Sequence, residues 1–304
     1  MAKVANETRD GRRVEPKKTP KKAFVSFVSF VSFVSFVSFV CAGQADGPKR
    51  IISLVPALTE MVFAIGAGDR MIAVSSYDEE PPAVKALPRV GALLDPDVER
   101  IIAMRADLVL LYGSQTDLIT QLRRASIPYY EYRHGGLATV TSTIRALGER
   151  LGRNREADRL AGDIESRMAA LRQRTATTKK PRTLLVFTRE RGSLRNIYAS
   201  GGRGFLHEML DAAGGANVFA DVQAESVQVS TEMILARAPE VILELRAEEI
   251  PSAQEQPAEI NTWRTLASIP AVRNNRLYFL PGRWYVVPGP RVAEAAEAMA
   301  RALR

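Results

Sequence analysis

The sequence predicts an α/β protein of two lobes, each a mainly parallel sheet flanked by helices, with one long helix joining them. Three observations lead to this fold class. Short apolar runs alternate with helical stretches along the chain, which is typical of parallel sheets. A helix–strand unit at residues 99–110 returns in altered form at residues 232–243. The longest amphipathic helical stretch lies between the two copies, so one copy falls in each lobe.

The repeated unit begins with a carboxylate and ends in an apolar strand. Glu99 and Glu232 stand 133 residues apart, and every matched position keeps that displacement. An acidic residue suits a helix start because the unpaired backbone N–H groups there carry partial positive charge. The apolar runs at 108–110 and 241–243 suit the buried centre of a parallel sheet. We therefore expect two related lobes built on one unit.

The N-terminal lobe is expected to span residues 50–152. Its first strand, 50–55, leads into a helix at Pro56, where the missing N–H costs nothing. Gly66 ends that helix, because helices commonly stop at a residue in the left-handed conformation. The other elements expected in this lobe are a strand at 71–76, a loop at 77–82, the first copy of the unit, a helix at 115–125, a strand at 128–133 and a helix at 139–151.

A connecting helix is expected within residues 153–180. Between 155 and 174, Leu160, Ile164, Met168 and Leu171 recur at helical spacing and share one face. The alternation of strands and helices then restarts, and the C-terminal lobe is expected to span residues 181–304. Its expected elements are a strand at 183–187, a helix at 205–213, the second copy of the unit, a strand at 277–280 and a helix at 290–303.

Residues 1–45 are interpreted as a signal peptide and not as part of the fold. A basic segment precedes an uncharged Phe-Val-Ser repeat at 24–40, and cleavage after Ala42 or Ala45 would release an exported chain. A retained membrane anchor is the alternative, because the repeat approaches the roughly 20 apolar residues that span a bilayer. Cys41 is the only cysteine, so no intramolecular disulfide can form, and lipid attachment at Cys41 is a less favoured alternative.

The positive charge is concentrated at the N-terminus. The 304-residue chain has a formal net charge of +8, from 42 Lys and Arg against 34 Asp and Glu. Residues 1–50 hold ten of these basic and four of these acidic residues, which leaves 32 and 30 in residues 51–304. The folded part is therefore nearly neutral, which argues against a nucleic-acid partner.

Residue types needed for a protein-built metal site or a catalytic centre are scarce. Only two histidines, His134 and His207, are present, whereas a zinc or manganese site needs several convergent ligands. The chain contains neither a G-x-x-x-x-G-K-[ST] phosphate loop nor a G-x-S-x-G nucleophile turn. We therefore expect no catalysis, no metal site of the protein's own and no cofactor, and any metal should arrive already chelated.

Several short motifs occur in an order that resembles a known family. They are R-I-I-S-L-V-P at 50–56 with Thr59-Glu60, V-S-S-Y at 74–77 with Pro81-Pro82, the two acidic units, G-G-A-N-V-F at 214–219 with Q-V-S at 228–230, and the segment 284–291. With a single long helix between the lobes, residues 50–304 resemble periplasmic substrate-binding proteins of the helical-backbone class. These proteins serve ABC importers of cobalamin, ferric siderophores and haem. The opening motifs are most similar to the cobalamin-binding branch.

The resemblance implies a non-catalytic, monomeric receptor in the periplasm. Such a receptor would capture a metal chelate in a cleft between the lobes, with cobalamin or another corrinoid as the first ligand and a ferric siderophore or haem as the alternative. It would deliver the chelate to a permease dimer, with Glu99 and Glu232 as docking carboxylates. The folded part would not contact the membrane. A membrane-anchored sensor or interaction domain of the same fold is a further alternative.

The ligand would contact loops that follow strands. The aromatic residues at such positions are Tyr77, Tyr112, Trp284 and Tyr285. Their rings suit a large flat ligand through burial and stacking. Arg133 and Arg189 also follow strands, where paired hydrogen bonds would favour carboxylate- or phosphate-bearing ligands. At 93–94 and at 226 the chain has leucines and a serine where we would look for the tryptophans of the cobalamin-binding branch.

Overall fold

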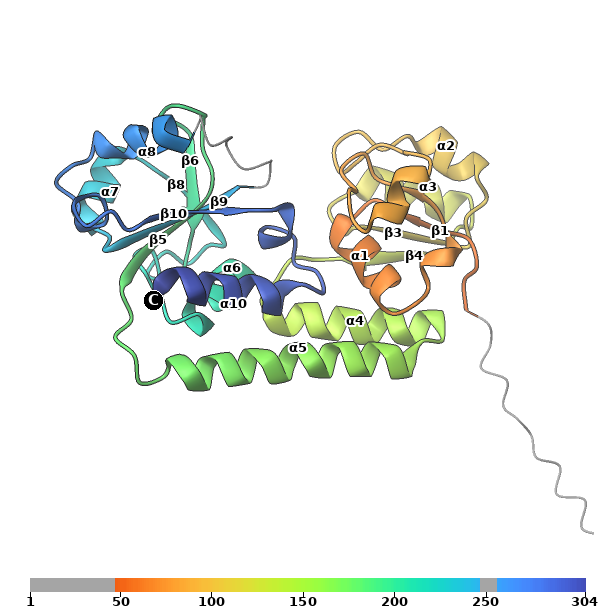
Figure 1. Ribbon diagram of the computed structural model, residues 1–304. Helices are drawn as coiled ribbons and strands as arrows, with labels where there is room; N and C mark the ends of the chain where they lie inside the picture. Colours follow the sequence, from red (N-terminus) through yellow and green to blue (C-terminus); the bar gives the residue numbers. More distant parts are fainter. Residues whose placement is uncertain (1–46, 247–255) are drawn as a thin grey trace, which may run out of the picture. The chain divides into compact units, whose positions relative to one another are not determined.

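The computed structural model describes residues 47–246 and 256–304 (Figure 1). These ranges form two β-sheets, each flanked by helices, so the α/β fold class predicted from the sequence is confirmed. We call the first sheet with its helices the N-terminal lobe and the second with its helices the C-terminal lobe. The predicted signal peptide, the Phe-Val-Ser repeat and Cys41 lie outside the described residues. Within the described ranges, no helix has both the length and the apolar character to cross a membrane.

The N-terminal sheet has the strand order β2-β1-β3-β4, and all of its pairs are parallel. Alternate strand residues face opposite sides, so Ile51 enters one apolar core and Ile52 another. Helices therefore have to cover both faces. The strands are β1 (Ile51–Ser53), β2 (Met71–Val74), β3 (Leu108–Tyr112) and β4 (Tyr129–Tyr132), and the helices are α1 (Pro56–Ala64), α2 (Val98–Ala103), α3 (Thr116–Arg124) and α4 (Leu137–Leu151), with short 3-10 turns η1 (Gly68–Arg70) and η2 (Pro82–Ala86).

The C-terminal sheet has the strand order β10-β9-β5-β6-β8, with β7 beside β5. Its β10-β9, β9-β5 and β5-β7 pairs are parallel, whereas β6 pairs antiparallel with both β5 and β8. Strands β6, β7 and β8 were not predicted, because each is at most four residues long and only partly apolar. The strands are β5 (Arg182–Thr188), β6 (Ile197–Ser200), β7 (Ala216–Asn217), β8 (Ser226–Val229), β9 (Val241–Arg246) and β10 (Leu277–Pro281). The helices are α6 (Gly204–Ala212), α7 (Thr231–Arg237), α8 (Gln256–Arg264), α9 (Pro270–Arg273) and α10 (Val292–Leu303), with a 3-10 turn η3 (Arg283–Tyr285).

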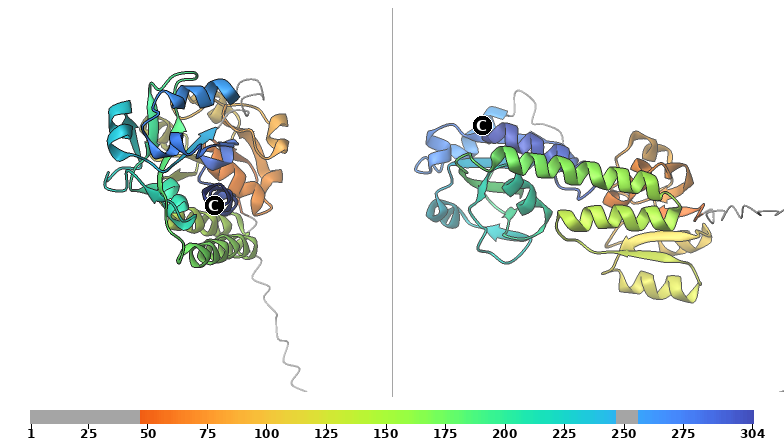
Figure 2. Two further views of the ribbon diagram at one scale, coloured as in Figure 1. Left: turned by 60° about the vertical axis from the view of Figure 1, so that its left-hand side comes forward. Right: turned by 90° about the horizontal axis from the view of Figure 1, so that it is seen from below.

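The expected connecting helix is α5 (Asn154–Thr175), and it lies beside α4 in an antiparallel helix pair (Figure 2). The chain reverses at Gly152, whose φ of 66° is a left-handed conformation that glycine adopts without a steric penalty. Gly148 allows close packing, since a Cβ there would lie 2.3 Å from the Cβ of Ala157. The buried face of α5 includes Ile164 and Met168, as its spacing predicted.

The first turn of α4 is capped by a residue from the C-terminal lobe. Glu208 on α6 accepts a hydrogen bond from the backbone N–H of Leu137 through Oε2, at 2.7 Å. Gly136, the residue before the helix, leaves room for this carboxylate, since a Cβ there would lie 2.0 Å from Glu208 Oε1 and would displace it. A carboxylate is well placed here, because the N-terminus of a helix presents unpaired N–H groups and partial positive charge.

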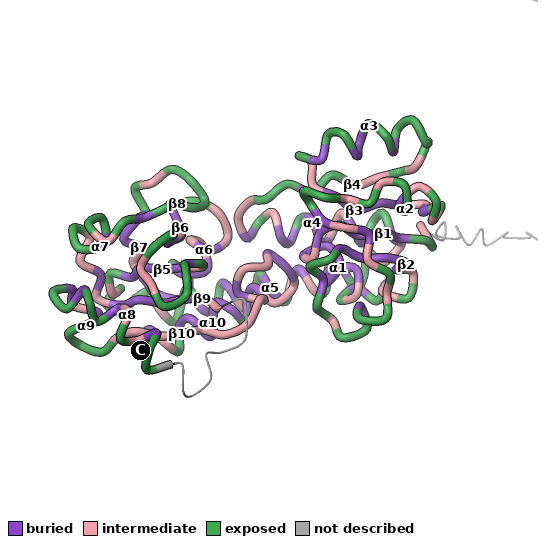
Figure 3. Tube along the Cα trace, turned by 90° about the horizontal axis from the view of Figure 1, so that it is seen from above, coloured by how far each residue is buried: buried purple, intermediate pink, exposed green. Residues whose placement is uncertain are grey.

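One apolar core runs through both lobes. It includes one face of each sheet and the inward sides of α4, α5 and α10, where buried stretches recur along the chain (Figure 3). Representative members are Leu58, Ile144, Ile164, Leu185, Leu210 and Met299. The opposite faces of the two sheets have separate cores of their own. The lobes are therefore joined by continuous apolar packing as well as by the connecting helix.

Candidate functional site

A pocket lies at the carboxyl ends of strands in the N-terminal sheet. It has a volume of about 300 Å³ and is lined by Leu54, Pro56, Tyr77, Leu93, Leu94, Asp95 and Tyr112. Leu54 and Pro56 follow β1, and Tyr112 ends β3. In parallel α/β sheets, ligands bind at this edge, where the loops that follow neighbouring strands meet. The structure therefore brings Tyr77 and Tyr112 together, as expected, and adds residues that had not been predicted to line the site.

The pocket exposes large apolar side chains to solvent. Tyr77 is 60% exposed, Leu93 39% and Leu94 93%, and these are three of the five large hydrophobic residues that are exposed in the described part of the chain. Exposed apolar side chains that gather in one place commonly mark a binding surface, because covering them removes apolar area from water. Leu93 and Leu94, which stand where tryptophans were sought in the sequence, thus supply apolar surface without a ring.

A tight turn after β2 holds Tyr77 outward. The buried Asp78 carboxylate accepts hydrogen bonds through Oδ2 from the backbone N–H and the hydroxyl of Ser75, at 2.9 and 2.5 Å. Arg89 donates to the carbonyl oxygens of Ser75 and Asp78. Burial raises the pKa of Asp78, and the hydrogen bonds from Ser75 only partly offset this. The turn is therefore fixed by buried polar contacts, while its tyrosine faces the pocket.

Three rings pack at the ends of β3 and β4. Tyr112 and Tyr132 have centroids 5.9 Å apart, and His134 lies 5.3 Å from Tyr112 and 5.4 Å from Tyr132. Desolvation raises the pKa of both tyrosines. Arg133, which stands between Tyr132 and His134 in the sequence, is exposed and lies at the same sheet edge. The pocket edge thus continues from Tyr112 to a histidine and an arginine.

The predicted aromatic pair after β10 is divided between core and surface. Trp284 and Tyr285 stack with centroids 4.2 Å apart, but Tyr285 is only 3% exposed and belongs to the shared core. Gly282 allows this packing, because its φ is 125° and a Cβ there would lie 2.1 Å from Trp284 Nε1. Trp284 therefore presents the more accessible ring of the pair.

An ion pair connects the Trp284 segment to the turn that carries Tyr77. Arg283 Nε lies 3.2 Å from Glu79 Oε1 across the two lobes. Arg283, the residue before Trp284, also donates to the carbonyl oxygen of Tyr77 at 3.5 Å. Trp284 itself does not line the pocket described above.

The Arg189 side chain lies in the interior of the C-terminal lobe and not on a surface that a ligand could reach. Its guanidinium is fully buried, with Nε 3.0 Å from Glu244 Oε1 and an ion pair to Glu259. Arg246 contacts the same two carboxylates at 2.6 and 2.8 Å, and Trp263 donates to Glu244. The expectation that Arg189 contacts ligand is corrected, because the four charges neutralise one another inside the C-terminal lobe.

The two copies of the repeated unit have the same local geometry. The helices α2 and α7 are capped by Asp97 and Ser230, which stand 133 residues apart and accept from matching backbone N–H groups. Each helix is followed within two residues by a residue in the left-handed conformation, Arg105 with φ 48° and Ala238 with φ 44°. These residues also differ by 133 positions, so the repeat seen in the sequence is a repeat of backbone conformation.

The acidic residues that follow these helices hold the neighbouring strands. Asp107 accepts from the backbone N–H of Arg50 at 2.8 Å, and Glu240 accepts from that of Arg182 at 2.9 Å. In return, the Arg50 side chain donates to the carbonyl oxygen of Met104 at the end of α2. The Arg182 side chain likewise donates to the carbonyl oxygen of Arg237 at the end of α7. Both units thus anchor helix and strand in the same way.

Glu99 and Glu232 project from equivalent positions, the second residue of α2 and of α7, and both are exposed. A hydrogen bond with Ser230 lowers the pKa of Glu232. Two exposed apolar residues, Met233 and Leu235, lie on the same short helix as Glu232. Each lobe therefore presents one carboxylate on the same structural unit.

A second cavity, of about 480 Å³, lies where α1, α5 and the start of α10 meet. Glu60 on α1 and Arg291 before α10 form a two-point ion pair there, at 2.9 and 3.1 Å. Burial raises the pKa of Glu60, and the arginine only partly offsets this. The buried charges of this cavity thus pair with one another and link the two lobes.

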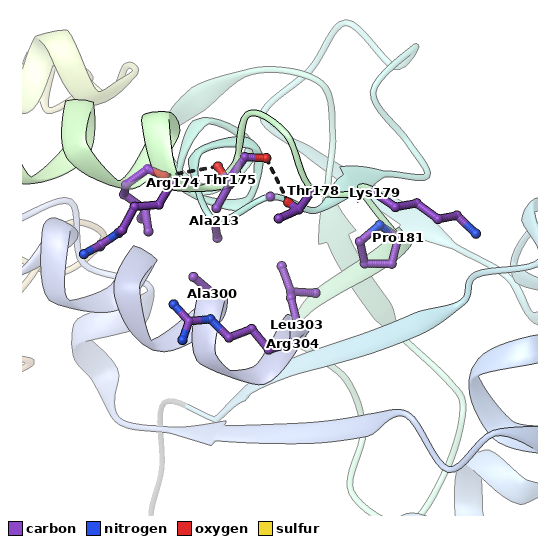
Figure 4. Close-up of a pocket in the computed structure, with 11 residues that line it drawn as sticks. Arg174, Thr175, Thr178, Lys179, Pro181, Ala213, Ala300, Leu303 and Arg304 are labelled. Carbon is purple, nitrogen blue, oxygen red and sulfur yellow. Dashed lines mark hydrogen bonds between the residues drawn. The ribbon is translucent and has the colours of Figure 1, made fainter.

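A third pocket, of about 340 Å³, is formed by helix ends (Figure 4). Thr175 at the end of α5 donates to the carbonyl of Ala212 at the end of α6, at 3.0 Å. The basic residues Arg174, Lys179 and Arg304 line it. Cations suit this position because helix C-termini carry partial negative charge. The pocket lies before β5, at the edge of the sheet opposite to the one where ligands bind in such folds.

Together these features describe a two-lobed binding protein with an apolar pocket at the strand ends of one lobe. The sequence matches the model of the family described as periplasmic binding protein over residues 51–284, and the chain therefore belongs to that family. The resemblance drawn from the sequence motifs is confirmed.

Individual relatives are named for the binding of vitamin B12 or haem. A vitamin B12-binding protein of Vibrio parahaemolyticus is 30% identical over 249 residues, covering 81% of this chain and 86% of the relative. The crystal structure of the periplasmic vitamin B12 binding protein of Vibrio cholerae superposes with a TM-score of 0.71 at 27% identity, covering 84% of this chain and 97% of that one. A periplasmic haem-binding protein of Roseiflexus superposes with a TM-score of 0.70 at 26% identity, covering 84% and 98%.

Proposed function

We propose that the protein is the substrate-binding component of an ABC importer and that it captures cobalamin or another corrinoid. The observation that carries this proposal is the pocket of exposed apolar side chains around Tyr77, Leu94 and Tyr112. A corrin ring offers a broad apolar face, which such a surface would cover. The similarity to proteins named for vitamin B12 binding supports the same ligand.

Delivery would use the two exposed carboxylates. Glu99 and Glu232 stand on the same local unit in each lobe, so together they offer two similar contacts. A permease built as a dimer presents the same surface twice, and two related carboxylates would match it. The protein would act as a monomer in the periplasm. It would bind and release its ligand without catalysis and without a cofactor.

A haem or a ferric siderophore is the second candidate ligand. The similarity to a haem-binding protein at 26% identity favours it, as does Arg133, an exposed cation at the same sheet edge as the pocket. A guanidinium would pair with the carboxylates that haem and many siderophores carry. Trp284 would add an aromatic contact from the other lobe for either ligand.

The proposal is tested by titrating the purified protein with cyanocobalamin, haemin, a ferric hydroxamate and a ferric catecholate. Binding would be followed by tryptophan fluorescence and by calorimetry. Trp263 is fully buried and bonded to Glu244, so ligand-dependent quenching should come from Trp284 and be largely lost in Trp284→Phe. Saturation by cyanocobalamin supports the first candidate, and saturation by a ferric chelate alone supports the second. Absence of heat and quenching with all four would refute both.

Mutations of the pocket need a matched surface control. Leu94→Ser should weaken cobalamin binding, because it removes an exposed apolar side chain from the pocket. Leu235→Ser removes a 40% exposed leucine from α7, outside the pocket, and should leave the affinity unchanged. Equal affinities for both variants would place the ligand elsewhere.

Docking is tested by reversing charge on each unit. Glu99→Arg and Glu232→Arg should keep ligand affinity but abolish ligand-dependent stimulation of the importer's ATPase in vesicles. Glu149→Arg, at an exposed position on α4, is the control and should retain stimulation. Normal stimulation by the Glu232→Arg variant would contradict the docking assignment.

A further inference from the structure

His134 is an exposed imidazole whose ring contacts Tyr112, a residue that lines the pocket. It follows β4, and its ring packs at 31° against Tyr112 and at 73° against Tyr132. Within the described ranges, these ring contacts are its interactions, and neither ring nitrogen takes part in a hydrogen bond. The other histidine differs, since His207 Nδ1 lies 3.3 Å from Asn217 Nδ2. His134 therefore offers ring nitrogens without hydrogen-bond partners in the described ranges, on a ring that packs against two tyrosines.

The pocket is too small to hold a whole macrocyclic chelate. Its volume of about 300 Å³ lies at the lower limit for sites that take drug-sized ligands, and a corrinoid is larger than these. A bound macrocycle must therefore extend along the strand ends beyond the pocket. The sheet order places β4 next to β3, so the surface beyond Tyr112 is the one that carries His134.

We propose that His134 coordinates the metal of the bound chelate through an imidazole nitrogen, taking an axial position that water held before. This inference rests on the proposed function and specifies the ligand class. The ligand would be a metal macrocycle with an exchangeable axial water, such as aquocobalamin or ferric haem. A siderophore that fills all six positions of ferric iron has no place for the imidazole.

The chemical step is a ligand exchange. A bond from the imidazole nitrogen to the metal forms, the bond from the metal to the water oxygen breaks, and the water leaves to solvent. The metal keeps its oxidation state, and an imidazolium would first release one proton. Neutral imidazole is among the commonest metal ligands in proteins and suits the transition metals.

The neighbouring tyrosines are weaker candidates for the same role. A phenol coordinates well only after losing its proton, and burial raises the pKa of both Tyr112 and Tyr132. The Tyr132 hydroxyl is buried without a partner in the described part of the chain, so it faces the protein interior. Both rings orient the imidazole and leave the coordinating position to His134.

The test compares two cobalamins that differ only in the upper axial group. Aquocobalamin has an exchangeable water, whereas cyanocobalamin has a cyanide that imidazole does not displace. The full protein should bind aquocobalamin at least about tenfold more tightly, which requires only about 1.4 kcal/mol from the new bond. The near-ultraviolet absorption band of aquocobalamin should move to longer wavelength on binding.

The variants assign the effect to one residue. His134→Phe keeps an aromatic ring beside Tyr112 and should give equal affinities for the two cobalamins, with no band shift. His207→Gln, the control, should behave as the unmodified protein. A band shift that survives in His134→Phe, or equal affinities in the unmodified protein, would overturn the inference.

The design separates this inference from the proposed function. Saturable binding of both cobalamins with equal affinities in the unmodified protein, and with no band shift for aquocobalamin, leaves the function standing and removes the inference alone. If neither cobalamin binds, haemin is titrated instead. A low-spin ferric spectrum that is lost in His134→Phe then supports coordination of haem. Absence of haemin binding overturns the inference and leaves only the ferric siderophore as a candidate ligand of the proposed function.

Discussion

Removing the Glu208 carboxylate should weaken the connection between α6 and α4. The carboxylate bonds to the Leu137 N–H at 2.7 Å, and no other side chain in the described ranges caps this helix. Loss of a helix cap typically costs about 1 kcal/mol, and the charged acceptor adds the interaction with the helix dipole, so Glu208→Ala should cost about 1–2 kcal/mol. Glu208→Gln keeps an acceptor but loses the charge, and should cost about 0.5 kcal/mol.

The assay is urea unfolding followed by circular dichroism, with Gly136→Ala as the partner mutation. A Cβ at Gly136 would lie 2.0 Å from Glu208 Oε1 and should displace the carboxylate, so this variant alone should cost about as much as Glu208→Ala. In the double mutant no carboxylate remains to be displaced, and the two costs should fall short of additivity by about 1 kcal/mol. Full additivity, or a cost for Glu208→Ala below about 0.3 kcal/mol, would refute the cap.

Three further outcomes are expected. Arg189→Met should destabilise the protein by about 3–5 kcal/mol in urea, because it leaves buried carboxylates unpaired, whereas exposed Arg133→Ala should change stability by less than about 0.5 kcal/mol; similar costs would contradict the buried network. Asp78 has a raised pKa, so its contribution to stability is complete below its ordinary pKa of 3.8 and is lost as pH rises through the folded value. Asp78→Asn should therefore flatten the pH dependence of unfolding above pH 3.8, and an unchanged slope would count against it. Gly282→Ala should cost about 1–3 kcal/mol by thermal unfolding and shift Trp284 emission, since both φ and the Cβ position are unfavourable; unchanged emission would argue against this packing.

The features that the sequence predicted correctly are local ones. Glu99 and Glu232 each begin a short helix that leads into an apolar strand, and both units form as expected. Helix propensity, capping and apolar runs act over a few residues, so they can be recognised without knowledge of the fold. The exposed Tyr77 was also recognisable, because it lies in a polar, proline-rich loop directly after a strand.

The features that were missed depend on partners far apart in the sequence. Arg189 was expected at the ligand surface, yet Glu244 and Glu259, 55 and 70 residues further on, hold it in the interior. The cap on α4 comes from Glu208, 71 residues beyond Leu137. At Leu94 the sequence shows only that a tryptophan is absent, because nothing in the neighbouring residues indicates that this side chain faces a pocket. Such contacts are set by tertiary packing.

The shared core has a consequence for engineering this protein. A fragment that stops before β5 would keep α4 and α5 but lose α6 and α10, the helices of the other lobe that pack against α5. Apolar faces uncovered in this way favour aggregation. Chimaeras that exchange pockets between relatives should therefore transfer the strand-end loops onto an intact scaffold. A whole lobe exchanged alone would bring only one side of the shared apolar core, which would then have to pack against a different partner.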